Sequence, residues 1–192
     1  MIRTTPSRPP YYPLFADVRG RRCVVVGAGL IAERKALALL RCEAQVTLVS
    51  PTVTRRLAQV IRQRRLRHIA RPFQPADLRG TWLAIAATND SAVNAQVVRA
   101  AARRQIFTNV VDQPALCSFI APAILRQGQL AIAISTGGAS PSLAKRIRRD
   151  LAQRVRREYT PQLRLLATLR PVVHQILPSY AARKRYFDRL LR

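Results

Sequence analysis

The chain has 192 residues, enough for one full domain and a smaller appendage, and its 48% hydrophobic content excludes a disordered tail. No apolar run approaches the roughly 20 residues of a membrane-spanning helix, and the residues before Tyr11 lack the apolar segment of a secretory signal, so we expect a cytoplasmic protein with a loose N-terminal extension. The 34 Lys and Arg residues against 9 Asp and Glu indicate a polyanion nearby: nucleic acid, a phosphorylated cofactor or a substrate with several carboxylates.

The first half of the chain alternates between short apolar strands and amphipathic helices. Residues 21–26 predict a buried strand, which is followed by the turn at Gly27 and by a helix from Ile31 to about Arg41. The elements expected next are a strand at 45–49, a basic helix near 53–64, a short strand at 67–70, a strand at 82–87, a helix at 91–104 and a strand at 106–111. This alternation predicts an α/β fold, a Rossmann-type doubly wound parallel sheet, over residues 1–113.

The pattern changes after Pro114. Residues 119–123 and 130–135 predict two strands, and apolar residues at four-residue spacing from Ser142 onward predict helical structure to the C-terminus. Two short strands cannot bury both of their faces alone, so we expect them to join a sheet contributed partly by another subunit. The sequence therefore predicts a small α+β dimerisation domain over 114–141 and a helical C-terminal domain over 142–192.

The segment Gly27-Ala28-Gly29-Leu30-Ile31-Ala32 follows a predicted strand and opens a predicted helix. In this context Gly27 can make the tight turn and Gly29 allows a pyrophosphate to approach the backbone, while the free N–H groups of the helix face the anion. The sequence therefore predicts NAD(P) binding at this turn. The alternative is an ordinary strand-to-helix turn.

The end of the second predicted strand lacks the acidic residue that usually binds the adenosine ribose. Ser50, Pro51 and Thr52 stand there instead, and Arg55 and Arg56 follow. Without a carboxylate to repel a 2′-phosphate, the sequence leaves both NAD and NADP open as cofactors.

Polar residues also follow two later strands, at the edge where open α/β sheets bind ligands. Asp90, at the end of Thr88-Asn89-Asp90, is expected to cap the helix that follows it rather than to act chemically. Asp112 ends an apolar strand beside a proline turn, so it could be partly desolvated and serve as a general base. A turn-forming aspartate is an equal alternative at this position.

The remaining reactive residues indicate no metal site. Cys23, Cys42 and Cys117 are odd in number and widely spaced, which favours reduced thiols, and the two histidines have no partner at metal-ligand spacing. The Gly-rich loop from Ser135 to Ser140 could bind an anion, or it could simply form a tight turn that caps the following helix.

Several motifs occur in a fixed order along the chain. They are Pro13-Leu14-Phe15, the stretch Val26–Lys35 with Arg34-Lys35 at its end, Ala87–Asp90, Asn109–Pro114, Ser118–Pro122 and Ser135–Pro141. Over about Tyr12 to Arg154 this set resembles the precorrin-2 dehydrogenase / sirohydrochlorin ferrochelatase family, which also forms the N-terminal module of sirohaem synthases.

The resemblance implies NAD-dependent oxidation of precorrin-2 to sirohydrochlorin by a homodimer, in some members joined by insertion of Fe²⁺, a substrate, to give sirohaem. It also implies that Asp112 matches the essential aspartate of the family. The contacts to NAD that the resemblance implies are Leu30, Ile31, Pro51 and Thr52. Together with Gly27 and Gly29 of the turn and Thr88 and Asn89 after a later strand, they make up the predicted cofactor site. The candidate contacts to the tetrapyrrole are Asn109, Ser135, Thr136 and Gly137.

Two other functions compete with this prediction. An NAD-sensing regulatory module would need the glycine turn but no catalytic carboxylate. A nucleic-acid-binding protein would account for the charge, but the aromatic residues form no stacking platform and no recognition motif is present, so we expect no specific nucleic acid. The net charge of +25 could also reflect only a solvated arginine-rich surface. Because no methyltransferase sequence follows, we expect uroporphyrinogen to be methylated by a separate protein.

Overall fold

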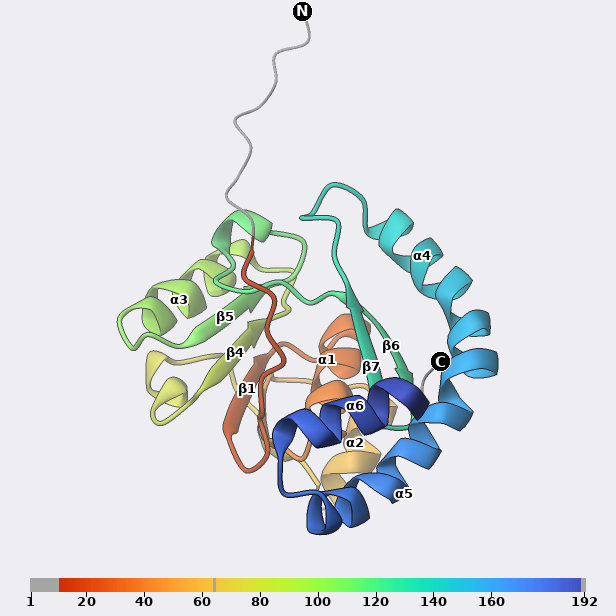
Figure 1. Ribbon diagram of the computed structural model, residues 1–192. Coiled ribbons are helices and arrows are strands. Elements are labelled where there is room, and N and C mark those ends of the chain that lie inside the picture. Colours follow the sequence, from red (N-terminus) through yellow and green to blue (C-terminus); the bar gives the residue numbers. More distant parts are fainter. Residues whose placement is uncertain (1–10, 64, 191–192) are drawn as a thin grey trace, which may run out of the picture. The chain divides into compact units, whose positions relative to one another are not determined.

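The computed structural model describes residues 11–63, 65–157 and 159–190 in full, and the backbone of residue 158. The predicted N-terminal extension therefore falls on residues outside the description. The chain divides into two compact units, the first ending at Ala121 and the second beginning at Pro122. Figure 1 shows the strands of the first unit and the long helices of the second.

Five parallel strands form the sheet of the first unit. They are β1 (Arg22–Val26), β2 (Gln45–Val49), β3 (Arg67–Ile69), β4 (Leu83–Ala86) and β5 (Phe107–Val110). Their order in the sheet is β3-β2-β1-β4-β5, so the chain winds outward from β1 to β3 and then returns to place β4 on the other side of β1. This reversal creates the switch point, where open α/β sheets bind their ligands.

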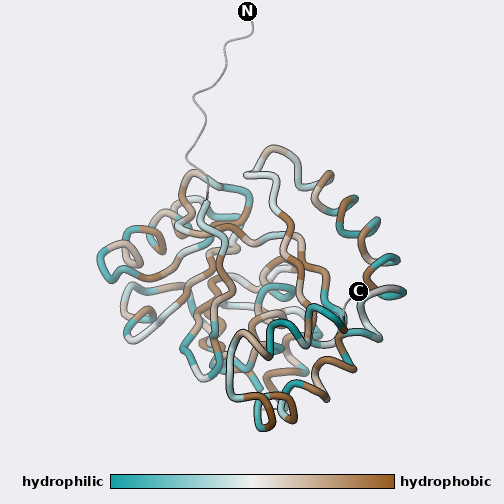
Figure 2. Tube along the Cα trace, viewed as in Figure 1, coloured by the Kyte–Doolittle hydropathy of each residue, from teal (hydrophilic) through white to brown (hydrophobic). Residues whose placement is uncertain are grey.

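Helices cover both faces of this sheet, which confirms the predicted doubly wound fold. Alternate residues of β1 enter different cores: Cys23 and Val25 pack with α1 (Leu30–Leu40) and α2 (Arg55–Arg62), whereas Val24 and Val26 pack with α3 (Ser91–Ala102) and the short helix η1 (Pro75–Leu78). Because both faces are buried, four successive residues of β1 and of β2 are buried, and their sequences are continuous apolar runs rather than alternating ones. Figure 2 shows this concentration of hydrophobic residues along the strands.

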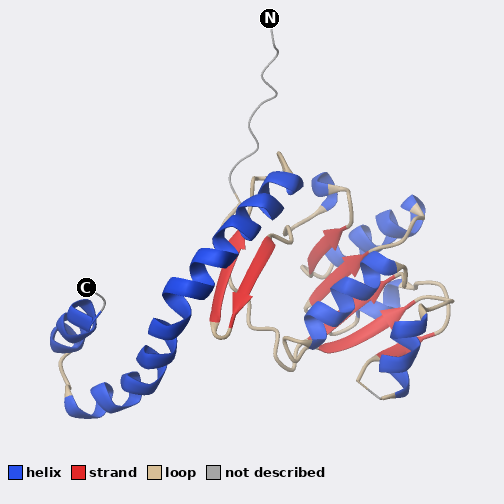
Figure 3. Ribbon diagram, turned by 90° about the vertical axis from the view of Figure 1, so that its right-hand side faces the viewer, coloured by secondary structure: helices blue, strands red, loops and turns tan. Residues whose placement is uncertain are grey.

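The second unit contains an antiparallel hairpin and a series of helices. The hairpin pairs β6 (Ala123–Gln127) with β7 (Leu130–Ile134). The helices that follow are α4 (Pro141–Arg154), the π-helical turn η3 (Val155–Tyr159), α5 (Thr160–Ile176) and α6 (Tyr180–Leu190). Figure 3 shows α4 lying along the hairpin. The predicted strand 130–135 and the helical C-terminus are confirmed, while a role of the hairpin in dimerisation stays a prediction.

The predicted strand at 119–123 is wrong, because β6 begins only at Ala123. A short helix, η2 (Pro114–Leu116), follows β5, and the chain then runs back beside that strand: the Ser118 N–H donates to the Thr108 carbonyl at 2.8 Å. The Phe119 ring packs edge-on against Phe107, with 6.5 Å between the ring centroids. The apolar residues of this segment therefore close the edge of the first unit instead of forming the hairpin.

A partly buried ion pair fixes the connection between β3 and β4. The carboxylate of Asp77 accepts hydrogen bonds from the Arg71 guanidinium at 2.6 and 2.9 Å and from the Gln74 N–H at 2.8 Å. Burial alone would raise the pKa of Asp77, but these donors outweigh it and hold the pKa below its usual value. A carboxylate with a lowered pKa stabilises the fold above its unfolded pKa of about 3.9 and loses this contribution as the pH falls through the folded pKa.

We expect Asp77→Asn to lower the free energy of unfolding at pH 7 by about 1–3 kcal/mol, because the substitution leaves Arg71 without its charged partner. The difference from the wild type should shrink as the pH falls below about 4, where the unfolded carboxyl takes up its proton, and down through the lower pKa of the folded carboxyl. Urea denaturation at several pH values measures both effects. The control is Asp150→Asn, which removes an exposed partner 4.0 Å from Arg146 and should change stability little.

Candidate functional site

The carboxyl ends of four parallel strands bring the predicted cofactor residues and Asp112 to one edge of the sheet. Gly27 follows β1, Pro51 follows β2, Thr88 follows β4 and Asp112 follows β5. Since these strands are neighbours in the sheet order, residues separated by many positions in the sequence share the switch point.

Gly27 is required by packing between β1 and β4. Its φ is +98°, a conformation that residues with a side chain rarely adopt. A Cβ at this position would collide with the Ala87 carbonyl, since it would lie 2.8 Å from the Ala87 carbon and even closer to its oxygen. The Gly27 N–H donates to the Val49 carbonyl at 2.9 Å. The turn is thus held against both neighbouring strands.

Gly29 leaves the N-terminus of α1 open. It is the N-cap of that helix with no side-chain cap, whereas Thr54 caps α2 and Asp90 caps α3. The first backbone hydrogen bond of α1 runs from the Glu33 N–H to the Gly29 carbonyl. The N–H groups that precede Glu33 in the helix therefore need a partner from outside the helix. Apart from its chain neighbours and the backbone of α1, no atom of the described residues lies within 4 Å of a Cβ built on Gly29. These features fit a pyrophosphate.

Leu30, Ile31 and Ala32 have different exposures in this first turn. Leu30 is 74% exposed, Ile31 is partly buried and Ala32 is fully buried. Ala32 therefore permits close packing of helix and sheet. The exposed Leu30 side chain lies at the mouth of the turn, where it is free to contact a ligand.

Glu33 is a structural residue of this edge that sequence reasoning missed. Its carboxylate is buried, accepts a hydrogen bond from the Thr54 hydroxyl at 2.5 Å, and lies 3.8 Å from the Arg56 guanidinium. It ties the first turn of α1 to the first turn of α2. Because Arg56 is engaged by Glu33, Arg55 is the freer of the two arginines considered for a 2′-phosphate. An acidic residue in the first turn of a helix was the available signal.

Pro51 and Thr52 are exposed beyond β2, as expected of residues that contact a ligand. Behind them the Ser50 carbonyl lies 2.8 Å from His68 Nε2, and the Ser50 N–H donates to the Ile69 carbonyl. His68 therefore supports the end of β2 from the neighbouring strand.

The end of β4 is organised by Thr88 and a buried asparagine, Asn94. The Asn94 amide donates to the Thr88 carbonyl at 3.1 Å, and its oxygen lies 2.8 Å from the Thr88 hydroxyl. Asn89 is exposed. Asp90 accepts from the N–H groups of Ala92 and Val93, which confirms the prediction that it caps the helix.

Asp112 is held in an unusual backbone conformation beyond β5. Its φ is +58°, in the left-handed region that aspartate and asparagine tolerate better than most residues. The side chain is exposed, so the expectation of partial desolvation is wrong for the isolated chain. The physical reason is that Asp112 lies in a turn past the end of the strand, where none of the described elements of its own unit covers it.

A network beneath this turn fixes the position of Asp112. Cys117 is buried, and its sulfur accepts from the Val110 N–H at 3.1 Å and lies 3.3 Å from the Gln113 carbonyl. Asn109 is also buried, and its amide donates to the Phe119 carbonyl at 3.1 Å. The side chain of Asn109 therefore supports the loop from within, and its predicted contact with substrate stays a prediction.

Lys35 brings a positive charge into the neighbourhood of Asp112. Burial lowers the pKa of this half-buried ammonium and the adjacent Arg34 adds to the effect, whereas the charges of Cys117 and Asp112 act in the opposite direction. Lys35 thus lies within electrostatic range of Asp112. The Arg34-Lys35 pair carried part of the family resemblance, but helical periodicity could not show which strand end Lys35 approaches.

Ser135, Thr136 and Gly137 lie in the second unit, so the structure does not place them relative to Asp112. The Gly137 N–H donates to the Ser135 hydroxyl at 3.1 Å, and the Ser140 N–H donates to the Thr136 hydroxyl at 3.0 Å. Ser140 in turn caps α4 through the Leu143 N–H. The turn that caps the helix, one of the two alternatives for this loop, is therefore present, and anion binding stays a prediction.

Comparisons with known proteins agree with this geometry. The family described as Putative NAD(P)-binding matches residues 14–123, and that described as Sirohaem biosynthesis protein central matches residues 127–154. The solved structure of SirC, precorrin-2 dehydrogenase, superimposes with a TM-score of 0.82 and 30% sequence identity, over 95% of this chain and 90% of that one. The chain belongs to the precorrin-2 dehydrogenase family.

Relatives of this family include longer proteins. A siroheme synthase of Photobacterium profundum is 36% identical over 180 residues, which are 94% of this chain and 38% of that protein. A siroheme synthase of Methylobacillus flagellatus is 40% identical over 176 residues, which are 92% of this chain and 38% of that protein. The chain thus spans less than half the length of these relatives.

The described residues contain no group of three or more His, Cys, Asp or Glu side chains that could hold a metal ion. Cys23 and Cys117 are free thiols. Burial, with a smaller contribution from Cys42, raises the pKa of Cys23 to about 11. Within the same part of the chain, no helix is long and apolar enough to cross a membrane.

The two glycines should respond differently to alanine. We expect Gly27→Ala to destabilise the protein by more than about 2 kcal/mol, because the methyl group meets the Ala87 carbonyl in a backbone conformation that alanine avoids. Gly29→Ala should keep the fold, since its φ of −69° suits alanine and the space around it is open. Thermal denaturation distinguishes the two variants.

Gly29→Ala should nevertheless weaken NAD binding by at least about tenfold, the effect of losing about 1.4 kcal/mol of contact. The added methyl group would stand between the helix N–H groups and the pyrophosphate. Calorimetric titration with NAD measures the affinity. An unchanged affinity in a folded Gly29→Ala protein would place the dinucleotide elsewhere.

Proposed function

We propose that this chain is an NAD-dependent dehydrogenase that oxidises precorrin-2 to sirohydrochlorin in sirohaem biosynthesis. The observation that carries the proposal is the match to SirC, precorrin-2 dehydrogenase, over 95% of this chain and 90% of that one. Support comes from the edge of the sheet, where an open helix N-terminus and an exposed carboxylate follow neighbouring strands.

The residues at the switch point fit a dinucleotide. The pyrophosphate would lie against the N–H groups at the start of α1, beside Gly29, and the adenosine ribose would lie near Pro51 and Thr52. Thr88 and Asn89 would border the nicotinamide half. We propose NAD as the partner, in line with the resemblance, and the contact of Arg56 with Glu33 at 3.8 Å leaves Arg55 as the freer arginine for a 2′-phosphate.

Oxidation of precorrin-2 removes a hydride and a proton, and bound NAD would accept the hydride. Asp112 is the residue that we assign to the proton. Its carboxylate is exposed to an incoming ligand, and the hydrogen bonds of Cys117 and Asn109 hold the turn on which it lies. A positioned carboxylate accepts the proton while the alignment of macrocycle and nicotinamide supplies most of the rate.

The tetrapyrrole carries carboxylate side chains around its rim, and basic residues would bind them. Within the first unit we assign this role to Lys35, because its ammonium is half-buried and lies near Asp112. Contacts from Ser135, Thr136 and Gly137 belong to the same proposal.

The proposal also includes the assembly and the pathway. We assign residues 114–141 to dimerisation and 142–192 to a helical C-terminal domain, in a cytoplasmic homodimer that receives precorrin-2 from a uroporphyrinogen methyltransferase. Exposed apolar side chains on the hairpin and helices, including Ile124, Leu143 and Leu165, support self-association. Light scattering tests this, and a monomeric mass would contradict it.

Ferrous iron enters the proposal only as a substrate, in a second reaction that inserts it into sirohydrochlorin. Asp112 could relay the pyrrole protons that this step releases. Anaerobic incubation of the pure protein with sirohydrochlorin and Fe²⁺ tests the reaction. If sirohaem forms no faster than it does without protein, the chain does not catalyse iron insertion, and the dehydrogenase proposal is unaffected.

The decisive experiment compares the wild type with Asp112→Asn during anaerobic incubation with precorrin-2 and NAD. We expect the variant to lose about 100-fold or more of the rate, because asparagine cannot accept the proton. Asparagine retains the left-handed backbone, so the fold and NAD affinity should be unchanged. Absorbance of NADH and sirohydrochlorin measures turnover.

Asp90→Asn is the matched control, since it removes a carboxylate from the neighbouring strand end while asparagine still caps α3. We expect it to retain the wild-type rate. The competing function is an NAD-sensing module without catalysis. No turnover by the wild type, together with measurable NAD affinity, would favour that module over the dehydrogenase.

A further inference from the structure

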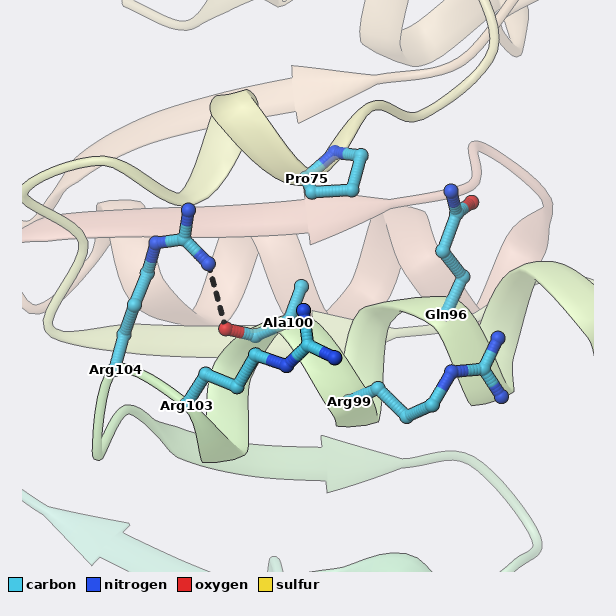
Figure 4. Close-up of a pocket in the computed structure, with 6 residues that line it drawn as sticks. All are labelled: Pro75, Gln96, Arg99, Ala100, Arg103 and Arg104. Carbon is cyan, nitrogen blue, oxygen red and sulfur yellow. Dashed lines mark hydrogen bonds between the residues drawn. The ribbon is translucent and has the colours of Figure 1, made fainter.

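A cavity of about 620 Å³ lies between the C-terminal half of α3 and the short helix η1, within the first unit (Figure 4). Its lining is dominated by arginines: the residues are Pro75, Gln96, Arg99, Ala100, Arg103 and Arg104. The volume falls within the range of small-molecule sites in proteins. Nothing in the proposed dehydrogenase reaction uses this cavity.

The cavity lies away from the edge that would hold NAD. Helix α3 begins just after the carboxyl end of β4, where Asp90 caps it, and ends at Ala102, shortly before the amino end of β5. Its last turns therefore approach the amino ends of the strands, whereas Gly27 and Asp112 follow the carboxyl ends. A ligand in this cavity would not overlap the dinucleotide.

The charges of the cavity are uncompensated. Within the residues that the structure describes, Arg99, Arg103 and Arg104 take part in no ion pair. The one acidic residue of η1, Asp77, is already bound by Arg71 at 2.6 Å. The C-terminus of α3 provides a partial negative charge of about one half, which offsets only part of three guanidinium groups.

One of these arginines is already ordered. The Arg104 guanidinium donates to the Ala100 carbonyl at 2.9 Å, and Figure 4 shows this bond at the side of the cavity. Its remaining N–H groups are free to meet a ligand, and a pre-oriented guanidinium loses less entropy when it binds an anion. Gln96 adds an amide, and Pro75 and Ala100 add a small apolar surface.

We propose that this cavity is a second ligand site, which binds a small molecule carrying two or more anionic groups. Guanidinium groups pair in the same way with phosphates and with carboxylates, so diphosphates and polycarboxylates share the chemistry that the cavity recognises. The Gln96 amide and the apolar patch accommodate the uncharged part of such a molecule. The site is independent of the proposed dehydrogenase reaction.

The test is calorimetric titration of the full chain, saturated with NAD so that the glycine turn is occupied. Inorganic pyrophosphate and citrate are the probes for the two anion chemistries, in buffer of physiological salt concentration. We expect at least one probe to bind with one site per chain. The tighter of the two identifies the group that the cavity prefers.

The variant Arg99→Gln/Arg103→Gln should weaken this binding by at least about tenfold for each guanidinium removed. The matched control is Arg148→Gln/Arg149→Gln, which removes the same charge from exposed positions of α4 and should keep the affinity within about twofold. Circular dichroism and the melting temperature verify the folding of both variants. If the glutamine variant fails to fold, the variant Arg99→Lys/Arg103→Lys replaces it in the test. Lysine keeps the positive charge but cannot make the paired hydrogen bonds of a guanidinium, so this variant should weaken binding by an intermediate factor.

Two results would overturn the site. One is the absence of saturable binding of both probes to the NAD-saturated wild type. The other is an equal loss of affinity in the α4 control, which would show that the anion responds only to the overall positive charge. Neither result bears on dehydrogenase turnover, so the second site and the proposed reaction can fail separately.

Discussion

The close approach of β1 and β4 at Gly27 is the constraint on which the rest of the site depends. The Ala87 carbonyl occupies the space where a side chain would project, and the φ is positive, so glycine is required between β1 and the start of α1. This turn directs the uncapped N-terminus of α1 across the switch point. The same contact keeps β4 in register with β1, which in turn positions Thr88 and, one strand further, Asp112.

Two kinds of interaction share the task of stabilising this arrangement. Apolar burial on both faces of the sheet fixes the strands, as the continuous buried runs of β1 and β2 indicate. Polar side chains then fix the strand ends: Glu33 joins α1 to α2, Asn94 supports Thr88 and Cys117 supports the turn of Asp112. These polar groups are buried and satisfied, so they give the edge a defined shape that apolar contacts alone would leave less specific.

Much of the fold could be predicted from the sequence, because helical and strand periodicity is strong in residues 21–111. The capping role of Asp90 was equally clear, since a short acidic residue before a helical pattern has one common use. The start of β6 was predicted too early because Phe119 and Ile120 are apolar, as strand residues often are. Only the contacts of Phe119 with β5 show that this segment packs beside β5 instead of forming the hairpin. Glu33, Lys35 and the arginine cavity were missed for a related reason: each depends on which elements become neighbours in three dimensions, which local patterns do not contain.

The left-handed backbone at Asp112 also bears on how proteins of this kind diverge. At a φ of +58° the backbone favours aspartate, asparagine and glycine, while the proposed chemistry requires a carboxylate. Aspartate meets both demands, whereas asparagine and glycine meet only the first. A descendant released from selection for catalysis should therefore drift to asparagine or glycine at this position before it accepts other residues, so the identity of a single side chain would distinguish an active enzyme from a fold kept for another purpose.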